Sequence, residues 1–435
     1  MLCFGDSFDF DAGELMRLSR RTLLRSMAAA GAVAALPAVA RAQEGDSIWD
    51  MFSRNRVLRD TDRNSNTAAA NAAIETNEPI LSVDTAYNLQ QAIAQYEPFV
   101  AAGGWEQVPK EVFGLTLGNG RRSVVALKRR LMSSGDLPPA ERIDDMFDAQ
   151  TDQAVRNFQA RHGLIVTGQV DEPTFYAMAV PAETRLNQLR LNLTRVQNIS
   201  QTLTDRYLVV NVPAASAEAI ENSAVAQRHV AVVGRIDRQT PILHSKVHQI
   251  NFNPYWHVPK SIIQKDLIKY MNEDPEYLTK FRIHIYDGKG NELQPTDINW
   301  STNEAVNYMF RQEPGAENSM GHVKINFPNP YDVYMHDTPT KSLFGENARF
   351  HSSGCMRINE VDSLVAWLLQ SNGDWDVGRV QQTFASNERL DVKVKNPTPV
   401  HTTYITAWAN RQGTVSFRDD VYNFDAEGRT TFEQG

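Results

Sequence analysis

The chain has 435 residues, enough for two or three domains, and 42% of them are hydrophobic, so we expect a sizeable core rather than wholesale disorder. The net charge of −8 at pH 7 argues against a nucleic acid as the partner, because binding the phosphate backbone needs a basic face. No apolar run of about 18 residues follows the N-terminal region, so we expect no membrane span downstream of it.

The N-terminus has the pattern of an export signal. Arg20 and Arg21 directly precede an Ala-rich, mildly hydrophobic stretch, and Ala40-Arg41-Ala42 offers a small-x-small cleavage site. We therefore predict that residues 1–42 are a signal peptide that resembles the twin-arginine type and sends the protein to the periplasm. An uncleaved anchor is the alternative, and Met16 is an alternative start.

Cleavage would remove Cys3 and leave Cys355 as the one cysteine of the mature chain. An exported protein of this size does not need disulfides. A leftover thiol therefore indicates either an intermolecular bridge or a reactive group.

Polar and helical segments come first in the mature chain. Residues 43–80 are polar and repetitive and predict a flexible linker. From Asp84 the apolar residues recur at helical spacing until Gly103-Gly104, so residues 81–117 are predicted to be a helical segment.

Residues 118–182 predict a compact module of three short helices. Leu127 and Leu131 belong to one apolar stripe, and Val155 and Phe158 belong to a second. Three such helices can bury these stripes against one another.

The third of these helices begins at Asp171, its predicted cap, with Pro173 in the first turn. The stretches "FDAQTDQAVRNFQARHGL" and "TGQVDEPTFYAM" resemble a three-helix peptidoglycan-binding domain. The resemblance implies murein as the ligand. A scaffold module that only separates the other domains is the alternative.

A helical link is predicted over 183–204, and β-rich runs follow over 205–425, with 426–435 as a tail. "HVAVVGRI" is mostly apolar and predicts a central strand. "YDVYMHD" alternates, with Tyr334 and His336 on the face opposite Val333 and Met335. "HTTYITAWAN" is the last clear strand. Residues 254–310, with a predicted helix in "SIIQKDLIKYM", have a different character and indicate an insertion.

Cys355 lies in "RFHSSGCMRI" and is followed by a predicted helix with Asn359 as its cap. The thiol is therefore expected on a loop before a helix N-terminus, where free N–H groups and a partial positive charge favour a thiolate. His336, at the end of a predicted strand, is the candidate base. The N–H groups of Gly354 and Cys355 are candidates to hold an oxyanion, and Arg357 to hold a carboxylate.

At these residues the chain resembles the L,D-transpeptidases. "VYMHDTPTKSLFGENARFHSSGCMRI" is similar to their catalytic motif, and "RQEPGAENSMGHVKINFPN" and "INFNPYWHVPKSI" are similar to the large periplasmic subgroup. We therefore predict a multidomain α+β protein: a peptidoglycan-binding-like module and a β-rich catalytic domain with an inserted capping subdomain.

The resemblance implies roles for individual residues. Cys355 matches the nucleophile, and His336 matches the base, oriented through the backbone of Asp337. The oxyanion hole matches Gly354 and the Cys355 amide. Five further residues are expected to bind substrate: Arg357, Ser353, Ser352, Trp256 and Tyr255.

Other histidines are weighed against simpler interpretations. His351 is a candidate second histidine beside the thiol, with a surface loop position as the alternative. His244 and His248 are four residues apart but strand-like, and no compact zinc signature occurs, so we expect no metal and no cofactor. Tyr255 and Trp256 are as compatible with packing inside the insertion as with stacking on substrate.

The resemblance implies 3→3 cross-linking of peptidoglycan stem peptides through a thioester on Cys355. An L,D-carboxypeptidase on the same scaffold differs in using water as the acceptor, and attachment of a protein to murein differs in using another amine. A non-catalytic murein-binding protein is the alternative of another class.

Overall fold

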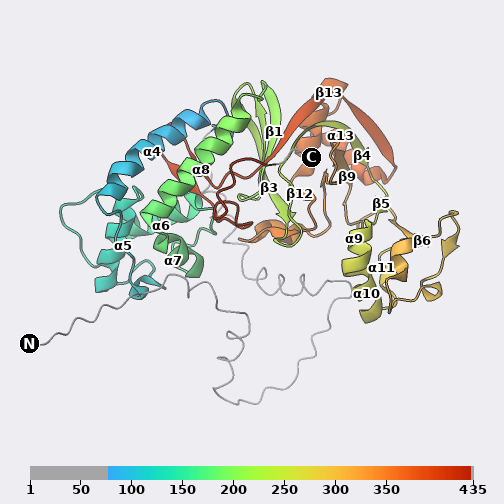
Figure 1. Cartoon of the computed structure of the whole chain (residues 1–435), viewed down its shortest axis with the longest axis horizontal. Helices are drawn as coiled ribbons and strands as arrows, with labels where there is room; N and C mark the ends of the chain where they lie inside the picture. Colours follow the sequence, from blue (N-terminus) through green and yellow to red (C-terminus); the bar gives the residue numbers. More distant parts are fainter. Residues whose placement is uncertain (1–76, 433–435) are drawn as a thin grey trace, which may run out of the picture. The chain divides into compact units, whose positions relative to one another are not determined.

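The computed structural model describes residues 77–432 (Figure 1). The signal peptide predicted for 1–42 and nearly all of the linker predicted for 43–80 lie outside these residues. No helix among those described is long and apolar enough to cross a membrane.

The first part of the described chain is helical. Its elements are α4 (Thr85–Ala101), η1 (Lys110–Val112), α5 (Arg122–Ser133), α6 (Ala149–Arg161), α7 (Glu172–Ala179) and α8 (Ala182–Ser200). Each helix predicted in this region is present, including the link, which is α8. After α4 the chain turns at Gly103 and Gly104, whose φ angles are 105° and 68°, values that favour glycine.

Carboxylates hold the starts of two helices in the predicted three-helix module. Asp148 accepts a hydrogen bond from the Thr151 N–H at 2.8 Å, and Asp171 accepts one from the Thr174 N–H at 3.1 Å. The apolar stripes meet in a common core as expected, with the fully buried residues Val124, Leu127, Leu131, Phe147, Val155 and Phe158.

A second core joins the helices to strands of the following domain. α4 and α8 lie side by side (Figure 1) and bury Leu89, Leu189 and Val196 against Val209 and Phe417. Arg161 at the end of α6 pairs with Asp136 at 2.5 Å and donates to the Val415 carbonyl at 3.1 Å. The helical part of the chain is therefore bound to the β-rich domain by apolar contacts of α4 and α8 and by polar contacts of Arg161 in α6.

The β-rich domain contains a sheet of nine strands in the order β11-β3-β12-β10-β9-β4-β13-β1-β2. Because β2 also pairs with β3, the sheet closes on itself. Its strands are β1 (Arg206–Asn211), β2 (Ser216–Glu221), β3 (Ala224–Gly234), β4 (His244–Phe252), β9 (Val323–Asn326), β10 (Met335–His336), β11 (Phe350–Ser352), β12 (Met356–Ile358) and β13 (Leu390–Thr403). The expected fold class, a helical module followed by a β-rich domain, is confirmed.

Two strand predictions need correction. "HTTYITAWAN" is not one strand: β13 ends at Thr403, and Ala407–Ala409 form β14, which pairs with β15 (Val415–Phe417). "YDVYMHD" contributes only Met335–His336 as strand, because Asn329 binds the backbone of Val333 and holds the preceding residues in a turn. The predicted alternation nevertheless holds, since Val333 and Met335 both enter the main core.

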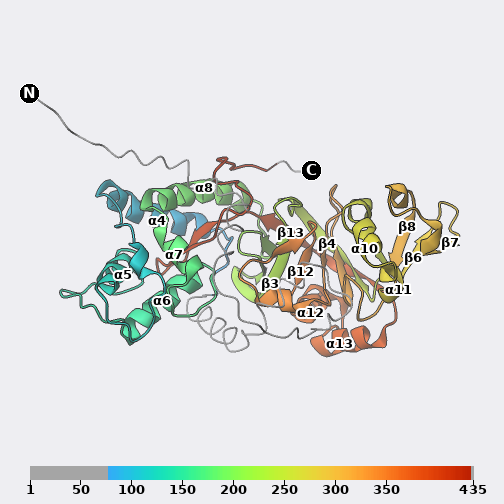
Figure 2. The ribbon, with the colours of Figure 1, turned by 90° about the horizontal axis from the view of Figure 1, so that it is seen from below.

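The insertion after β4 has a sheet and a core of its own (Figure 2). The sheet has the order β5-β8-β6-β7, with β5 (Trp256–His257), β6 (Ile283–Tyr286), β7 (Glu292–Leu293) and β8 (Met309–Gln312). The predicted helix is present as α9 (Lys260–Ile262), the π-helical η2 (Ile263–Leu267) and α10 (Ile268–Glu273). The shorter turns are α11 (Tyr277–Lys280), η3 (Pro295–Asp297) and η4 (Glu304–Asn307).

The helix expected after the cysteine begins differently from the prediction. α12 spans Val361–Leu369, and its N-cap position is Glu360, in the left-handed conformation with φ 48°, rather than Asn359. β12 lies between Cys355 and this helix, so the helix N-terminus is not adjacent to the thiol. The remaining elements are η5 (Lys341–Gly345), η6 (Gln370–Asn372) and α13 (Val377–Ser386).

The cap of α7 can be tested by a matched pair of substitutions. Asp171→Ala removes the acceptor for the Thr174 N–H, and we expect it to lower the free energy of unfolding by about 1 kcal/mol. Asp171→Asn keeps an oxygen there and should stay close to the parent protein. Urea unfolding of both variants measures the difference, and equal stability of the two would contradict the role of the cap.

Candidate active site

The candidate site is built on the parallel pairing of β10 with β12. Met335 lies opposite Met356 and His336 lies opposite Arg357, and the Met356 N–H donates to the Tyr334 carbonyl at 3.0 Å. The two methionines are fully buried in the main core. Because side chains alternate along a strand, Tyr334, His336, Cys355 and Arg357 share the opposite face.

The same register relates the two residues expected to do chemistry. Cys355 is level with Tyr334, so His336 is its diagonal neighbour on the adjacent strand. This register is consistent with the thiol and the imidazole lying on one face of neighbouring strands.

His336 is buried, and one of its two ring nitrogens is committed. Its Nδ1–H donates to the backbone carbonyl of Asp337 at 2.5 Å, the contact expected from the resemblance. This bond selects the tautomer in which Nε2 carries the free lone pair. Burial and the positive charge of Arg357 lower the pKa of His336 to about 3, so the imidazole is neutral near pH 7.

Asp337 is itself held in place by polar contacts. Its carboxylate accepts from the His322 N–H at 3.0 Å and pairs with Lys341. A Cβ at Gly321 would lie 2.3 Å from Asp337 Oδ2, so only glycine fits at that position of the turn. The backbone that orients His336 is therefore supported from the preceding "SMGHVKINF" segment.

The electrostatic environment of the thiol differs from the prediction. Burial raises the pKa of the Cys355 thiol to about 11, and hydrogen bonds with Tyr334 and the charges of Lys324 and Arg357 lower it only in part. The expected helix N-terminus does not contribute, because β12 separates it from Cys355. The free protein therefore holds a neutral thiol rather than a thiolate.

Tyr334 is the residue at this site that the sequence interpretation missed. Its side chain is hydrogen-bonded to Cys355 and to Trp256 of the insertion, and burial raises its pKa far above the usual value. The Tyr334 and His336 rings meet edge to face with centroids 5.6 Å apart, and the Lys324 Nζ lies 4.2 Å from the Tyr334 ring centroid. The alternation of "YDVYMHD" placed Tyr334 on the same face as His336, and that was the available signal.

The loop before Cys355 has more internal hydrogen bonds than the prediction assumed. Ser352 is buried, its Oγ donates to the Cys355 carbonyl at 2.5 Å, and it accepts from the Gly354 N–H at 3.2 Å. Two expectations are therefore corrected: Ser352 shapes the loop instead of facing a substrate, and the Gly354 N–H is already used. In residues 77–432 we find no partner for the Cys355 N–H, which stays a candidate oxyanion donor.

The remaining expected residues lie in three different settings. Ser353 is exposed, and its Oγ accepts from the Arg238 guanidinium at 2.8 Å. Tyr255 is stacked against the guanidinium groups of Arg311 and Arg389, at 4.4 and 4.6 Å from its ring centroid. Trp256 packs at the edge of the core of the insertion and its side chain also interacts with Tyr334, while stacking on a substrate stays a prediction.

The histidines outside the site have other partners. His351 lies in β11 rather than on a surface loop, and its Nε2 is 2.8 Å from Glu346 Oε2 and from the Ala348 carbonyl rather than at the thiol. His244 is paired with His401, with their Nδ1 atoms 2.7 Å apart. In the described part of the chain no group of three or more metal-ligating side chains occurs.

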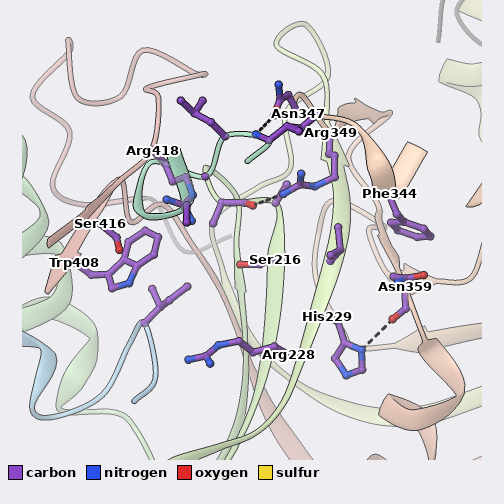
Figure 3. A pocket seen from close by; sticks show the side chains of 18 of the residues that line it. Ser216, Arg228, His229, Phe344, Asn347, Arg349, Asn359, Trp408, Ser416 and Arg418 are labelled. Atoms are coloured by element: carbon purple, nitrogen blue, oxygen red, sulfur yellow. Dashed lines mark hydrogen bonds between the residues drawn. The ribbon is translucent and has the colours of Figure 1, made fainter. Parts of the chain in front are cut away.

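A cavity of about 610 Å³ lies apart from the expected catalytic residues (Figure 3). It is lined by Ser216, Arg349, Trp408 and Arg418, among others, and the Ile165 N–H of the helical module donates to Asn347 at its edge, at 2.6 Å. None of the expected catalytic or substrate-binding residues lines it.

The comparisons with known families agree with this architecture. Residues 205–402 match the model described as "L,D-transpeptidase catalytic domain" (YkuD), and residues 120–178 match the "Putative peptidoglycan binding domain" model. The two matched segments correspond to the β-rich domain and to the three-helix module, respectively. The first match covers less than half of the chain, and it makes residues 205–402 similar to the catalytic domain of the L,D-transpeptidases.

A curated relative from Haemophilus influenzae, named "Putative L,D-transpeptidase", is 32% identical over 221 residues, which is 51% of this chain. The match spans 45% of that relative, so it covers about half of its length.

Two solved structures are also similar. An L,D-transpeptidase from Xylanimonas cellulosilytica DSM 15894 is 14% identical, with 67% of this chain and 98% of that chain covered and a TM-score of 0.22. Mycobacterium tuberculosis L,D-transpeptidase 1 is 13% identical, with coverage of 46% and 61% and a TM-score of 0.18.

The neutral thiol leads to a prediction for chemical modification. In a Cys3→Ser background, alkylation of Cys355 by iodoacetamide should accelerate about tenfold per pH unit between pH 7 and pH 9, because the thiolate fraction is rising throughout. Mass spectrometry gives the rate. A plateau below pH 8 would show a thiol with a depressed pKa and contradict the prediction.

The contribution of Tyr334 can be measured in the same experiment. Tyr334→Phe removes the hydroxyl that lowers the pKa of Cys355 and should slow alkylation at every pH in that range. Tyr331→Phe is the matched control, because Tyr331 is 48% exposed and near in sequence, and it should leave the rate unchanged.

Proposed function

We propose that this protein is a peptidoglycan L,D-transpeptidase that forms 3→3 cross-links through a thioester on Cys355. The proposal is carried by one observation: the β10–β12 register puts Cys355 and His336 on one face, with His336 Nδ1 committed to the Asp337 carbonyl. Nε2 is then the nitrogen available to exchange a proton with the sulfur. The matched catalytic family supports the same chemistry.

In the first half of the reaction, the substrate is a stem tetrapeptide whose third residue is a diamino acid. The Cys355 thiol gives its proton to His336 Nε2 as the sulfur attacks the carbonyl between the third and fourth residues. The oxyanion that forms is held by the Cys355 N–H. The C–N bond then breaks, His336 returns the proton to the leaving amine, and terminal D-alanine departs, leaving a thioester.

In the second half, the side-chain amine of a neighbouring stem peptide attacks the thioester carbonyl. His336 Nε2 accepts a proton from this amine, the carbon–sulfur bond breaks, and the proton passes to the Cys355 sulfur as thiol. A new amide is formed and both residues return to their starting states. Sulfur suits the two half-reactions because it is a good nucleophile and also a good leaving group.

The resting protonation states of Cys355 and His336 determine at which step the thiol ionises. With a neutral thiol and a neutral imidazole, proton transfer is coupled to attack on a bound substrate rather than completed beforehand. The positive charges of Lys324 and Arg357, both of which lower the pKa of Cys355, then favour the negative charge that develops on the sulfur.

Substrate contacts are proposed for the groups around this face. Arg357, level with His336, has the planar fork of donors that suits a carboxylate of the stem peptide. Ser353 lies on the loop before Cys355, and Trp256 lies in the insertion. The two side chains would therefore contact the substrate from two sides. The peptidoglycan-binding domain supports the polymer as partner, and export to the periplasm through the predicted twin-arginine signal would bring the protein to it.

Other functions differ in the acceptor or in the absence of chemistry. Water as acceptor gives an L,D-carboxypeptidase, and an amine of a protein gives attachment to murein. A non-catalytic murein-binding protein is disfavoured by the arrangement of His336 and Cys355, which a binding role does not require.

Incubation with disaccharide-tetrapeptide fragments and mass analysis of the products tests the proposal. We expect cross-linked dimers that have lost one D-alanine, no product from Cys355→Ala, and a loss of about 10²–10⁴-fold in rate for His336→Gln. Products shortened by hydrolysis alone would favour the carboxypeptidase.

A carbapenem provides a second readout at the same sulfur. A covalent adduct should form on the parent protein and be absent in Cys355→Ala. Failure of the folded parent protein to form either adduct or product would favour the non-catalytic alternative.

A further inference from the structure

Arg238 joins the insertion to the loop that carries Cys355. Its Nη2 donates to Asp266 Oδ1 at 2.9 Å, and its Nη1 donates to the second oxygen of the same carboxylate. Nη1 also donates to Ser353 Oγ at 2.8 Å. Asp266 belongs to η2 in the insertion, and Ser353 is two residues before Cys355, so one guanidinium contacts both.

This ion pair is shielded from solvent. The side chains of Arg238 and Asp266 are 11% and 20% exposed. A two-point guanidinium–carboxylate contact has a defined geometry, which ordinary surface pairs lack. Asp266 also lies in the π-helical turn of the insertion, an irregularity that is frequent at functional sites.

The loop that carries Arg238 is fixed to the catalytic loop by its backbone. The Arg235 N–H donates to the Ser352 carbonyl at 3.0 Å, and Thr240 Oγ1 donates to the Gly354 carbonyl at 2.8 Å. From the C-terminal segment, the Tyr422 hydroxyl donates to the Gly234 carbonyl at 2.6 Å. Arg238 therefore projects from a backbone segment that is hydrogen-bonded to the residues around Cys355.

We propose that Arg238 is a positioning residue that clamps the insertion against the Cys355 loop through Asp266 and Ser353, so that a bound acyl donor is held and water is kept from its thioester. This rests on the proposed function. The clamp acts on the insertion and not on the reacting atoms. Its loss should therefore weaken binding of the acyl donor and favour hydrolysis, while the attack itself proceeds.

Kinetics of the cross-linking reaction test the clamp. Arg238→Ala and Asp266→Asn should each raise KM for the acyl donor about five- to thirtyfold, leave kcat within about twofold, and increase the hydrolysed share of the products. Arg235→Ala is the matched control, because the Arg235 side chain pairs with Asp237 on its own loop, at 3.1 Å, and does not reach the insertion. It should behave like the parent protein.

Exchange of the two charges separates positioning from general destabilisation. The double variant Arg238→Asp with Asp266→Arg restores a pair of opposite charges and should recover most of the lost KM and product ratio. An unchanged KM in the single variants, or a double variant no better than either single one, would overturn the clamp.

A readout independent of turnover keeps this inference distinct from the proposed function. Opening of the insertion should speed iodoacetamide alkylation of Cys355 in Arg238→Ala and Asp266→Asn, but not in Arg235→Ala, at one fixed pH. This arm applies even if the parent protein makes no cross-links, in which case the proposed function fails alone. Equal alkylation rates in all four proteins would contradict the clamp.

Discussion

The pairing of β10 with β12 is the constraint on which the site depends. Met335 and Met356 are fully buried opposite each other, and a shift of one residue would turn them out of the core and turn His336 and Arg357 into it. The cost of exposing two large apolar side chains therefore also protects the relation between thiol and imidazole. Packing on one face of these strands sets the chemistry on the other.

Burial of the site determines the protonation states of Cys355 and His336. It disfavours both charged forms, so the pKa of Cys355 rises and that of His336 falls, and the resting pair is neutral. A neutral thiol is less reactive than a thiolate. Lys324 and Arg357 lie where they can stabilise negative charge once a substrate arrives. The arrangement suits a nucleophile that is generated during the reaction.

Local sequence signals predicted those parts of the fold that depend on near neighbours. The caps Asp148 and Asp171, the glycine turn after α4 and the stripes of the helical module are decided within a few residues, and helices were accordingly found where expected. The pairing of Cys355 with His336 was inferred from their residue types and from the resemblance, and the strand register is consistent with it.

Other features depend on residues distant in sequence and were missed for that reason. Short strands such as β12 exist because a neighbour completes their hydrogen bonds, and "MRI" alone has no strand pattern. The N-terminus of the following helix was expected to favour the thiolate of Cys355, but β12 lies between the thiol and that helix. The Gly354 N–H was expected to be free, but it donates a hydrogen bond to the Oγ of Ser352, which is buried by the surrounding fold.

The insertion is bound to the catalytic domain by contacts of a different kind from those that hold each part together. Its apolar residues form their own cluster, separate from the main core, so each part can keep its hydrophobic stabilisation when the two separate. Across the active site the contacts are polar: the Trp256 side chain with Tyr334, and Arg238 with Asp266. Net contributions of such hydrogen bonds and ion pairs are about 1 kcal/mol each, small beside a buried core. A few polar contacts near the thiol therefore decide how closely the insertion covers it.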